Sequence, residues 1–325
     1  MRIPSLLSKI YVSISLLACL NTMTHAQNLE VLAEYAVAFI GQDITNASDQ
    51  ASYLGATENA LKLSQTLSID VEIRDYTPQA SIGENQITAL AKAYAANVDA
   101  IIISPDFKTD LEPSLNFAAK HDYPIVFIGS APKDNSALAN IIVDEVATGK
   151  RMAERLLEQL PSNARAAILI DEPMSPAIKA RLSGVRGVLG FRKIEKVVST
   201  PPSYEAAVNT LLGEEANDTN DLISGWVLLS DWPLRGMPLL PWQPGRKPAV
   251  AYLTSPTSLN FLENNYVPVF ITHPYYSWGE QSVEIVIKKL FQNDSPQSQI
   301  IFSEALDVDR YNLMTYQEAW KNWLR

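Results

Sequence analysis

The feature that most constrains this chain is an alternation between short apolar runs and longer stretches with helical periodicity. Runs such as Asp99–Ile103 are rich in β-branched residues, as expected of strands that are buried on both faces. The helical stretches carry one apolar stripe, for example Val283, Val286, Ile287 and Leu290. Repeated strand–helix units predict an α/β fold with parallel sheets covered by helices on both faces. The predicted strands lie in Tyr35–Ile40, Ile69–Ile73, Asp99–Ile103, Pro124–Ile128, Asn140–Val143, Ala166–Ile170, Ile194–Ser199, Gly225–Leu229, Ala249–Leu253, Pro268–Thr272 and Gln299–Phe302.

The number of strands indicates two lobes rather than one sheet. About ten strands are more than one compact sheet usually holds, and lobes of about 120 to 150 residues are ordinary domain sizes. The natural break lies near Val143-Asp144, after a loop that contains Pro132, Lys133 and Asp134. The stretch Trp232–Lys247 contains four prolines, so we expect a broken helix and an irregular loop there.

The N-terminus is typical of an export signal. Arg2 and Lys9 precede a short apolar run, and Thr24-His25-Ala26 places small residues where a signal peptidase reads them. We therefore expect residues 1–26 to be a signal peptide and the mature chain to be soluble in the periplasm. An alternative is a lipoprotein signal, in which Cys19 is lipidated and anchors the protein to a membrane.

Composition excludes several classes of function. The 26 basic and 36 acidic residues give a net charge of −10, so nucleic acid is not an expected partner. One cysteine and three histidines leave little material for a disulfide framework or a metal site. No phosphate-binding P-loop and no G-x-S-x-G nucleophile motif is present. We expect no enzyme activity, no metal and no cofactor.

Polar and aromatic residues follow the predicted strands. The carboxyl ends of parallel strands are where open α/β sheets bind ligands, so these residues are candidates for a small polar ligand. They are Gln42, Asp43, Asn46, Ser104, Pro105, Asp106, Gly129, Ser130, Asp171, Glu172, Ser230, Asp231, Trp232, His273, Pro274, Tyr275 and Tyr276.

The order of these segments resembles one family, the type I periplasmic solute-binding proteins of the ribose-binding group. The resemblance runs over nearly all of the mature chain. It rests on Ala36–Ile40, Asn97–Pro105, Asp122–Ile128, Val143-Asp144 with Gly149, Arg181–Gly184, Ser230-Asp231 before Gly236, and His273-Pro274 before Gly279. Gene repressors share the fold but begin with a DNA-reading module, where this chain has an export signal.

The resemblance implies two Rossmann-like lobes with parallel sheets, joined by a three-segment hinge. The N-terminal lobe would comprise residues 27–143 and 274–303. The C-terminal lobe would comprise residues 144–273 and 304–325. The lobes would close on a ligand by rotation about the hinge.

The resemblance also implies ligand-binding residues, transferred position by position. Asn46, Arg181 and Tyr204 match ligand-binding positions, while Ser230 and His273 replace an asparagine and a glutamine. Departures at Ser48, Asp49, Gly129, Ser130 and Leu253 make a simple pentose doubtful, and Trp232, Tyr275 and Tyr276 could replace missing stacking surfaces. The predicted ligand-binding set is Asn46, Ser130, Arg181, Tyr204, Ser230, Asp231, Trp232, His273 and Tyr276.

Each of these residues also has a structural interpretation. Arg181 could pair with an acidic residue, Tyr204 could pack at a helix start, and His273 could be a core histidine. Trp232 could cap the rim of the interlobe space, and Asn46 could be a helix N-cap. We expect Arg181 to be the main polar clamp, so that Arg181→Ala weakens ligand binding and changes the stability of the ligand-free protein little.

The sequence thus predicts a monomeric binding protein that captures a sugar or sugar-like solute for an inner-membrane ABC importer. An alternative is a sensory role, in which the closed form docks on the periplasmic domain of a sensor kinase or chemoreceptor. Both partners would recognise lobe closure, so the fold does not separate them.

Overall fold

The computed structural model describes residues 31–106, 110–133 and 135–324. The strands in chain order are β1 (Glu34–Ile40), β2 (Asp70–Asp75), β3 (Ala100–Ile103), β4 (Ile125–Gly129), β5 (Ala139–Val143), β6 (Arg165–Asp171), β7 (Ile194–Thr200), β8 (Ile223–Leu228), β9 (Ala249–Tyr252), β10 (Val269–Thr272), β11 (Ile300–Ser303) and β12 (Leu306–Asp309). The helices are α2 (Ala47–Leu67), α3 (Gln86–Ala95), α4 (Glu112–Lys120), α5 (Glu145–Leu157), α6 (Pro176–Lys193), α7 (Tyr204–Asn217), α8 (Leu259–Glu263), α9 (Tyr275–Gln292) and α10 (Leu313–Trp323), with 3₁₀ turns η1 (Ala80–Ile82), η2 (Trp232–Leu234) and η3 (Pro256–Ser258).

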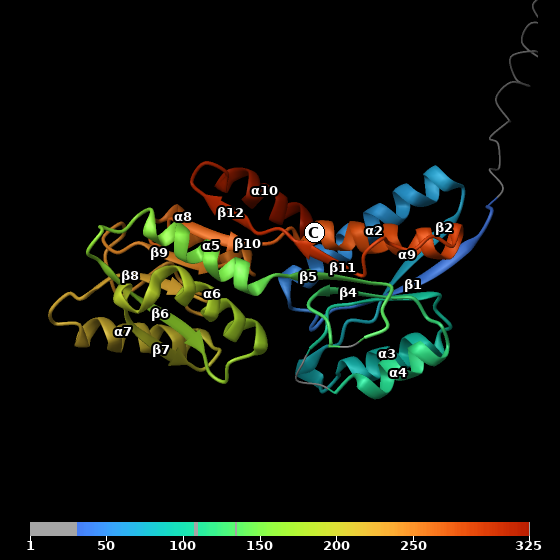
Figure 1. Ribbon diagram of the computed structural model, residues 1–325. Helices are drawn as coiled ribbons and strands as arrows, with labels where there is room; N and C mark the ends of the chain where they lie inside the picture. Colours follow the sequence, from blue (N-terminus) through green and yellow to red (C-terminus); the bar gives the residue numbers. More distant parts are fainter. Residues whose placement is uncertain (1–30, 107–109, 134, 325) are drawn as a thin grey trace, which may run out of the picture.

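The strands form two six-stranded sheets, one in each of two lobes that lie side by side (Figure 1). The N-terminal sheet has the order β11-β5-β4-β3-β1-β2, and the C-terminal sheet has the order β12-β10-β9-β8-β6-β7. All pairs are parallel except β10 with β12, which are antiparallel. The two-lobed α/β fold predicted from the sequence is therefore confirmed.

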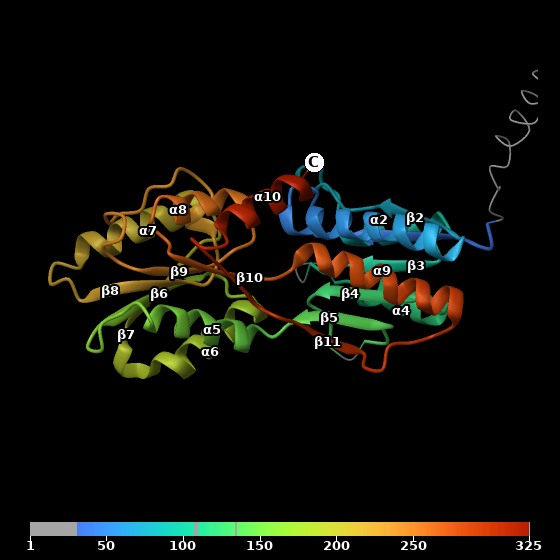
Figure 2. The ribbon, with the colours of Figure 1, turned by 90° about the horizontal axis from the view of Figure 1, so that it is seen from above.

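Helices cover both faces of each sheet. In the N-terminal lobe, α2 and α9 pack together on one face, and α3 and α4 lie on the other (Figure 2). In the C-terminal lobe, α5 and α6 form one such pair, and α7 and α8 cover the opposite face. Because both faces are covered, strand β3 is buried along its whole length.

Each apolar run predicted as a strand overlaps a strand of the structure, but β12 was not predicted. Its sequence alternates apolar residues with Asp307 and Asp309, so it does not read as a buried strand. It lies at the edge of its sheet, where one side of the strand is unpaired and polar residues are tolerated. The stretch from Trp232 to Lys247 is irregular apart from η2, as its prolines predict.

The chain passes between the two sheets three times. It leaves the N-terminal sheet after β5 and enters α5, returns after β10 into α9, and crosses again between β11 and β12. Helix α10 then lies over the junction between the lobes, between α8 and α2 (Figures 1 and 2). No helix in the described ranges is long and apolar enough to span a bilayer.

Two glycines let the paired helices approach closely. A Cβ atom on Gly149 of α5 would lie 1.9 Å from the carbonyl oxygen of Arg181 on α6. A Cβ atom on Gly279 of α9 would lie 1.8 Å from the carbonyl oxygen of Ser52 on α2. Any larger residue at either position would push the two helix backbones apart.

We predict that Gly149→Ala destabilises the protein by at least about 1 to 3 kcal/mol, the usual cost of overpacking. Gly213→Ala is the matched control, because Gly213 is also helical and a Cβ there meets no atom within 4 Å. The control should be neutral or slightly stabilising, since alanine favours helices. Urea denaturation measures both changes, and equal stabilities for the two variants would contradict the close helix packing.

Candidate functional site

The N-terminal lobe contributes the loop that follows β1. This loop is supported by two buried polar side chains, Asp49 and Gln86. Asp49 accepts a hydrogen bond from the backbone nitrogen of Gln42 at 2.7 Å, and burial raises the pKa of its carboxyl group to about 7. The amide nitrogen of Gln86 donates to the carbonyl oxygens of Gly41 at 2.8 Å and Ser104 at 2.7 Å. These bonds fix the ends of β1 and β3 relative to each other.

Asn46 and Ser130 are half-buried at this edge of the N-terminal sheet. The Asn46 side-chain oxygen caps α2, accepting hydrogen bonds from the backbone nitrogen of Ser48 at 3.1 Å and from its hydroxyl at 2.7 Å. Among the described residues, none accepts a hydrogen bond from the Asn46 side-chain amide nitrogen. This nitrogen is therefore available to donate to a ligand. Ser130 directly follows β4, beside Gly129, which has a positive φ of 77°.

Arg181 lies in the C-terminal lobe, but its side chain is buried and fully engaged. Only 4% of its surface is exposed. It donates from Nε and Nη2 to the Glu145 carboxylate at 2.8 and 2.6 Å, and from Nη1 to the carbonyl oxygen of Leu229. Its guanidinium also lies 3.6 Å from the ring centre of Tyr252. Arg181 therefore connects α6 to the start of α5 and to the end of β8.

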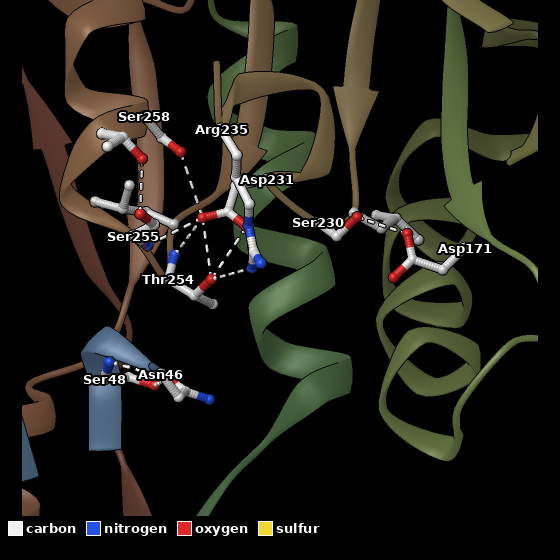
Figure 3. A network of polar contacts seen from close by, with 12 residues as sticks. Asn46, Ser48, Asp171, Ser230, Asp231, Arg235, Thr254, Ser255 and Ser258 are labelled. Carbon is white, nitrogen blue, oxygen red and sulfur yellow. Dashed lines mark hydrogen bonds and ion pairs between the residues drawn. The ribbon is translucent and has the colours of Figure 1, made fainter. Parts of the chain in front are cut away.

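Asp231 is the centre of a second buried network (Figure 3). It is 1% exposed and accepts hydrogen bonds from Arg235 at 2.9 Å and from the backbone nitrogens of Thr254 and Ser255 at 2.9 and 3.0 Å. The Ser258 hydroxyl adds a longer contact of 3.4 Å. Asp231 thus ties the loop after β8 to the loop after β9.

Asp171, Ser230 and Trp232 form a separate group at the ends of β6 and β8. The Ser230 hydroxyl donates to Asp171 at 2.6 Å, and Figure 3 shows this pair apart from the Asp231 network. Burial raises the pKa of the Asp171 carboxyl group, while hydrogen bonds from Ser230 and Trp232 and the charge of Arg181 oppose the increase. The Arg235 guanidinium lies 3.9 Å from the ring centre of Trp232. All three side chains are half-buried, so part of each faces solvent.

Tyr204 packs against the same region. Tyr204 is the first residue of α7. Its ring lies against Gly236, where an added Cβ atom would be 2.2 Å from the ring carbon Cζ. Gly236 follows η2, which contains Trp232. Tyr204 therefore supports the segment that carries Trp232.

His273 lies in the hinge and is completely buried. One ring nitrogen, Nε2, is 3.3 Å from the Thr148 hydroxyl, and the other, Nδ1, is 3.1 Å from the Ser303 hydroxyl. Thr148 follows the first chain crossing, His273 directly follows β10 at the second, and Ser303 lies at the third. Burial, and then the charge of Arg181, lowers the pKa of His273 to about 3, so the ring is neutral.

Tyr276 lies on the α10 side of the hinge. Its ring stacks on Trp323 with centroids 5.9 Å apart and planes 12° from parallel, and its hydroxyl donates to Glu58 on α2. The predicted set is therefore divided among four places. Arg181, Tyr204, Ser230, Asp231 and Trp232 gather in the C-terminal lobe, Asn46 and Ser130 lie in the N-terminal lobe, His273 lies in the hinge, and Tyr276 lies beside α10.

Four structural roles at the site were not predicted from the sequence: Asp49 and Gln86 as supports of the loop after β1, Asp171 as the partner of Ser230, and Glu145 as the partner of Arg181. Glu145 directly follows the predicted domain break, and Asp171 directly follows a predicted strand, so position gave a signal for both. Asp49 and Gln86 lie within helical stretches and carried none. Among the described residues, no cluster of three or more histidine, cysteine or acidic side chains has a geometry suited to a metal ion.

A periplasmic binding protein domain model matches residues 35–293. The chain belongs to this family. No curated protein matches the sequence. Among solved structures, the fold is similar to a periplasmic ribose ABC transporter protein from Conexibacter woesei, at 15% identity and a TM-score of 0.74, covering 90% of this chain and 98% of that one.

Two further solved structures have the same fold. A solute-binding protein from Agrobacterium vitis with bound D-fucose is 19% identical with a TM-score of 0.72, covering 87% of this chain and 99% of that one. A Caulobacter myo-inositol-binding protein is 15% identical with a TM-score of 0.69, covering 88% and 97%. These proteins share the two-lobed architecture described above.

We predict that Arg181→Ala destabilises the ligand-free protein by about 3 to 5 kcal/mol, because it leaves the Glu145 carboxylate unpaired. The burial of Arg181 thus changes the expectation from sequence that this variant affects binding alone. Arg186→Ala, exposed on the same helix, is the matched control and should change stability by less than about 0.5 kcal/mol. Denaturant titration of both variants is the measurement, and similar midpoints would show that the ion pair is dispensable.

A separate prediction concerns the dependence of folding stability on pH. The pKa of His273 falls from 6.5 in the unfolded chain to about 3 in the folded protein. Below pH 6.5 the unfolded chain therefore binds the additional proton, and folding stability decreases by roughly 1 kcal/mol for each pH unit until about pH 3. His273→Gln keeps hydrogen-bonding groups but does not titrate, so its stability should fall less steeply than that of the parent between pH 7 and pH 4. Parallel profiles in chemical denaturation would contradict a neutral buried imidazole.

Proposed function

We propose that this protein captures a small, uncharged polar solute of the sugar or polyol class between its two lobes. The observation that carries the proposal is the grouping of polar and aromatic side chains at the carboxyl ends of strands in both lobes, on either side of a three-segment hinge. Family membership and the names of the structural neighbours, which bind D-fucose and myo-inositol, support this choice of ligand class.

The charges near the strand ends favour a neutral ligand over an anion. The two guanidinium groups in this part of the C-terminal lobe, on Arg181 and Arg235, are already paired with Glu145 and Asp231. Asp171 is stabilised by the Ser230 hydroxyl, by the charge of Arg181, which is itself paired with Glu145, and by Trp232. An anionic ligand would thus meet a carboxylate without an uncommitted cation, whereas sugar hydroxyls can donate to Asp171.

We propose that Asn46 and Ser130 contact the ligand from the N-terminal lobe, and that Asp171, Ser230 and Trp232 contact it from the C-terminal lobe. Trp232 would offer its ring as a stacking face for a sugar. Tyr204, Arg181 and Asp231 would position these groups, which is consistent with their burial and internal partners. His273 would act at the hinge, and Tyr276 outside the ligand site.

The cellular setting is part of the proposal. Residues 1–26 would be a signal peptide, which lies outside the described residues, as does Cys19, the alternative lipid anchor. The mature monomer would act in the periplasm, with lobes of 27–143 plus 274–303 and 144–273 plus 304–325. It would deliver its ligand unchanged to an ABC importer, a partner favoured over a sensor domain because neighbours are named as ABC transporter components.

A thermal-shift panel tests the proposal. Neutral pentoses, hexoses and inositols should include at least one compound that raises the melting temperature, since a ligand at 100 times its Kd adds about 2.7 kcal/mol of stability. The matching uronic acids should give smaller shifts or none. A panel in which only the acids bind would contradict the charge argument, and a panel in which nothing binds would contradict the proposed function.

With the best neutral sugar, Asp171→Asn should weaken binding by about 10- to 150-fold, the usual range for losing a charged hydrogen-bonding partner. Asp70→Asn is the matched control, because Asp70 is exposed at the start of β2. Calorimetric titration compares the two. Unchanged affinity in Asp171→Asn would remove this carboxylate from the ligand site.

A further inference from the structure

Helix α10 contacts both lobes, although the sequence reading assigned residues 304–325 to the C-terminal lobe alone. It contacts α8 and β12 of the C-terminal lobe and α2 of the N-terminal lobe. Figures 1 and 2 both show it lying across the junction. A helix that is packed on both lobes must change its contacts when the lobes rotate relative to each other.

On the N-terminal side the contact is aromatic. Trp323 stacks on Tyr276 of α9, whose hydroxyl donates to Glu58 of α2. Trp320 is 1% exposed and lies 6.1 Å, centroid to centroid, from Tyr275. These rings attach the C-terminal end of α10 to the α2–α9 pair.

On the C-terminal side α10 packs against α8, and it is also attached through the backbone and one hydroxyl pair. Strand β12, which precedes α10, is paired with β10, and the Asn312 amide donates to the carbonyl oxygen of Asp307 at 2.8 Å. The hydroxyl groups of Tyr316 and Thr272 lie 3.3 Å apart. The N-terminal half of α10 therefore moves with the C-terminal lobe, and its other end holds the N-terminal lobe.

A surface pocket borders α10. It has a volume of about 290 Å³, is partly open to solvent, and lies between α10 and the beginning of α9. It is lined by Pro274, Tyr276, Tyr316 and Trp323 among others. Pro274 directly follows His273 in the second hinge crossing. The pocket leaves the aromatic rings room to move. Such room is needed if their contacts change when the lobes rotate relative to each other.

Open denotes the arrangement of the lobes in this structure, and it is defined by the bonding of the loops at the proposed ligand site. Among the described residues, no hydrogen bond joins the loops after β1 and β4 to the loops after β6 and β8. The α10 contacts are therefore formed while these loops do not bond to each other.

We propose that α10 is a strap that stabilises the open arrangement of the lobes through the Trp323–Tyr276 stack, and so sets the apparent ligand affinity. Weakening the stack increases the fraction of closed protein, and apparent affinity rises with that fraction. This inference rests on the proposed function only in treating lobe closure as the binding motion.

The experiment measures the distance between the lobes without any ligand. Spin labels at Lys120→Cys on α4 and Arg186→Cys on α6, both exposed positions, report the separation by pulsed electron resonance in a Cys19→Ser background. Trp323→Ala and Tyr276→Leu should each raise the ratio of short to long separations by about two- to tenfold, the range expected for losing one aromatic pair. Met314→Ala is the matched control, because Met314 lies on α10 and is 83% exposed; it should leave the distribution unchanged.

Two results decide the proposal, and a substitute variant covers the case in which a protein fails to fold. A shift to short distances in both aromatic variants supports it, and the double variant should shift no further than the single ones. Unchanged distributions, even with a lower melting temperature, would show that α10 only adds stability and would overturn it. If one aromatic variant fails to fold, Glu58→Gln, which loosens Tyr276, takes its place with the same expectation. Because no ligand is added, failure here leaves the sugar panel unaffected.

Discussion

The arrangement of the two lobes depends on a neutral, buried imidazole. His273 lies where the three crossing segments meet and contacts a hydroxyl from each of the other two. The Trp278 ring nitrogen donates to the same Ser303 hydroxyl at 2.8 Å, so the contact continues into α9. Since a buried polar group without partners is costly, each segment stabilises the position of the others. The proposed rotation of the lobes would then occur about a hinge whose segments stay together.

The proposed ligand surface is built by ion pairs that are satisfied within the protein. Arg181 pairs with Glu145, which lies 36 residues away in the sequence. Asp231 pairs with Arg235 and also accepts hydrogen bonds from Thr254 and Ser255 in the loop after β9. These pairs hold Ser230 and its neighbours in place before any ligand arrives, which lowers the entropy cost of binding. They also remove positive charge from the surface. In the proposed function, rigid positioning and selection against anions would therefore follow from the same contacts.

The sequence predicted the fold well because both faces of most strands are buried. The sequence Ile101–Ile103 predicts a strand for that reason, whereas β12 alternates apolar residues with partly buried aspartates and does not predict a buried strand. The site was predicted less completely. Family resemblance implied a ligand-binding role for Arg181, but its side chain pairs with Glu145, which is 36 residues away, and no local pattern indicates such a pairing.

The position of α10 across both lobes was not predicted, for a similar reason. Its amphipathic pattern indicates that one face is buried, yet the pattern does not say which lobe covers it. Tyr276 was predicted as a ligand residue from its position after the tenth strand. It faces α10 instead, because successive residues of α9 point to different sides of the helix. In both cases the missing information was a contact between distant segments.

The central claim is that ligand binding closes the two lobes about this hinge. Small-angle X-ray scattering of the protein, alone and saturated with the neutral sugar that gives the largest thermal shift, tests it most directly. The account predicts a smaller radius of gyration and a shorter maximum dimension with the sugar. Identical scattering curves at confirmed saturation would contradict it.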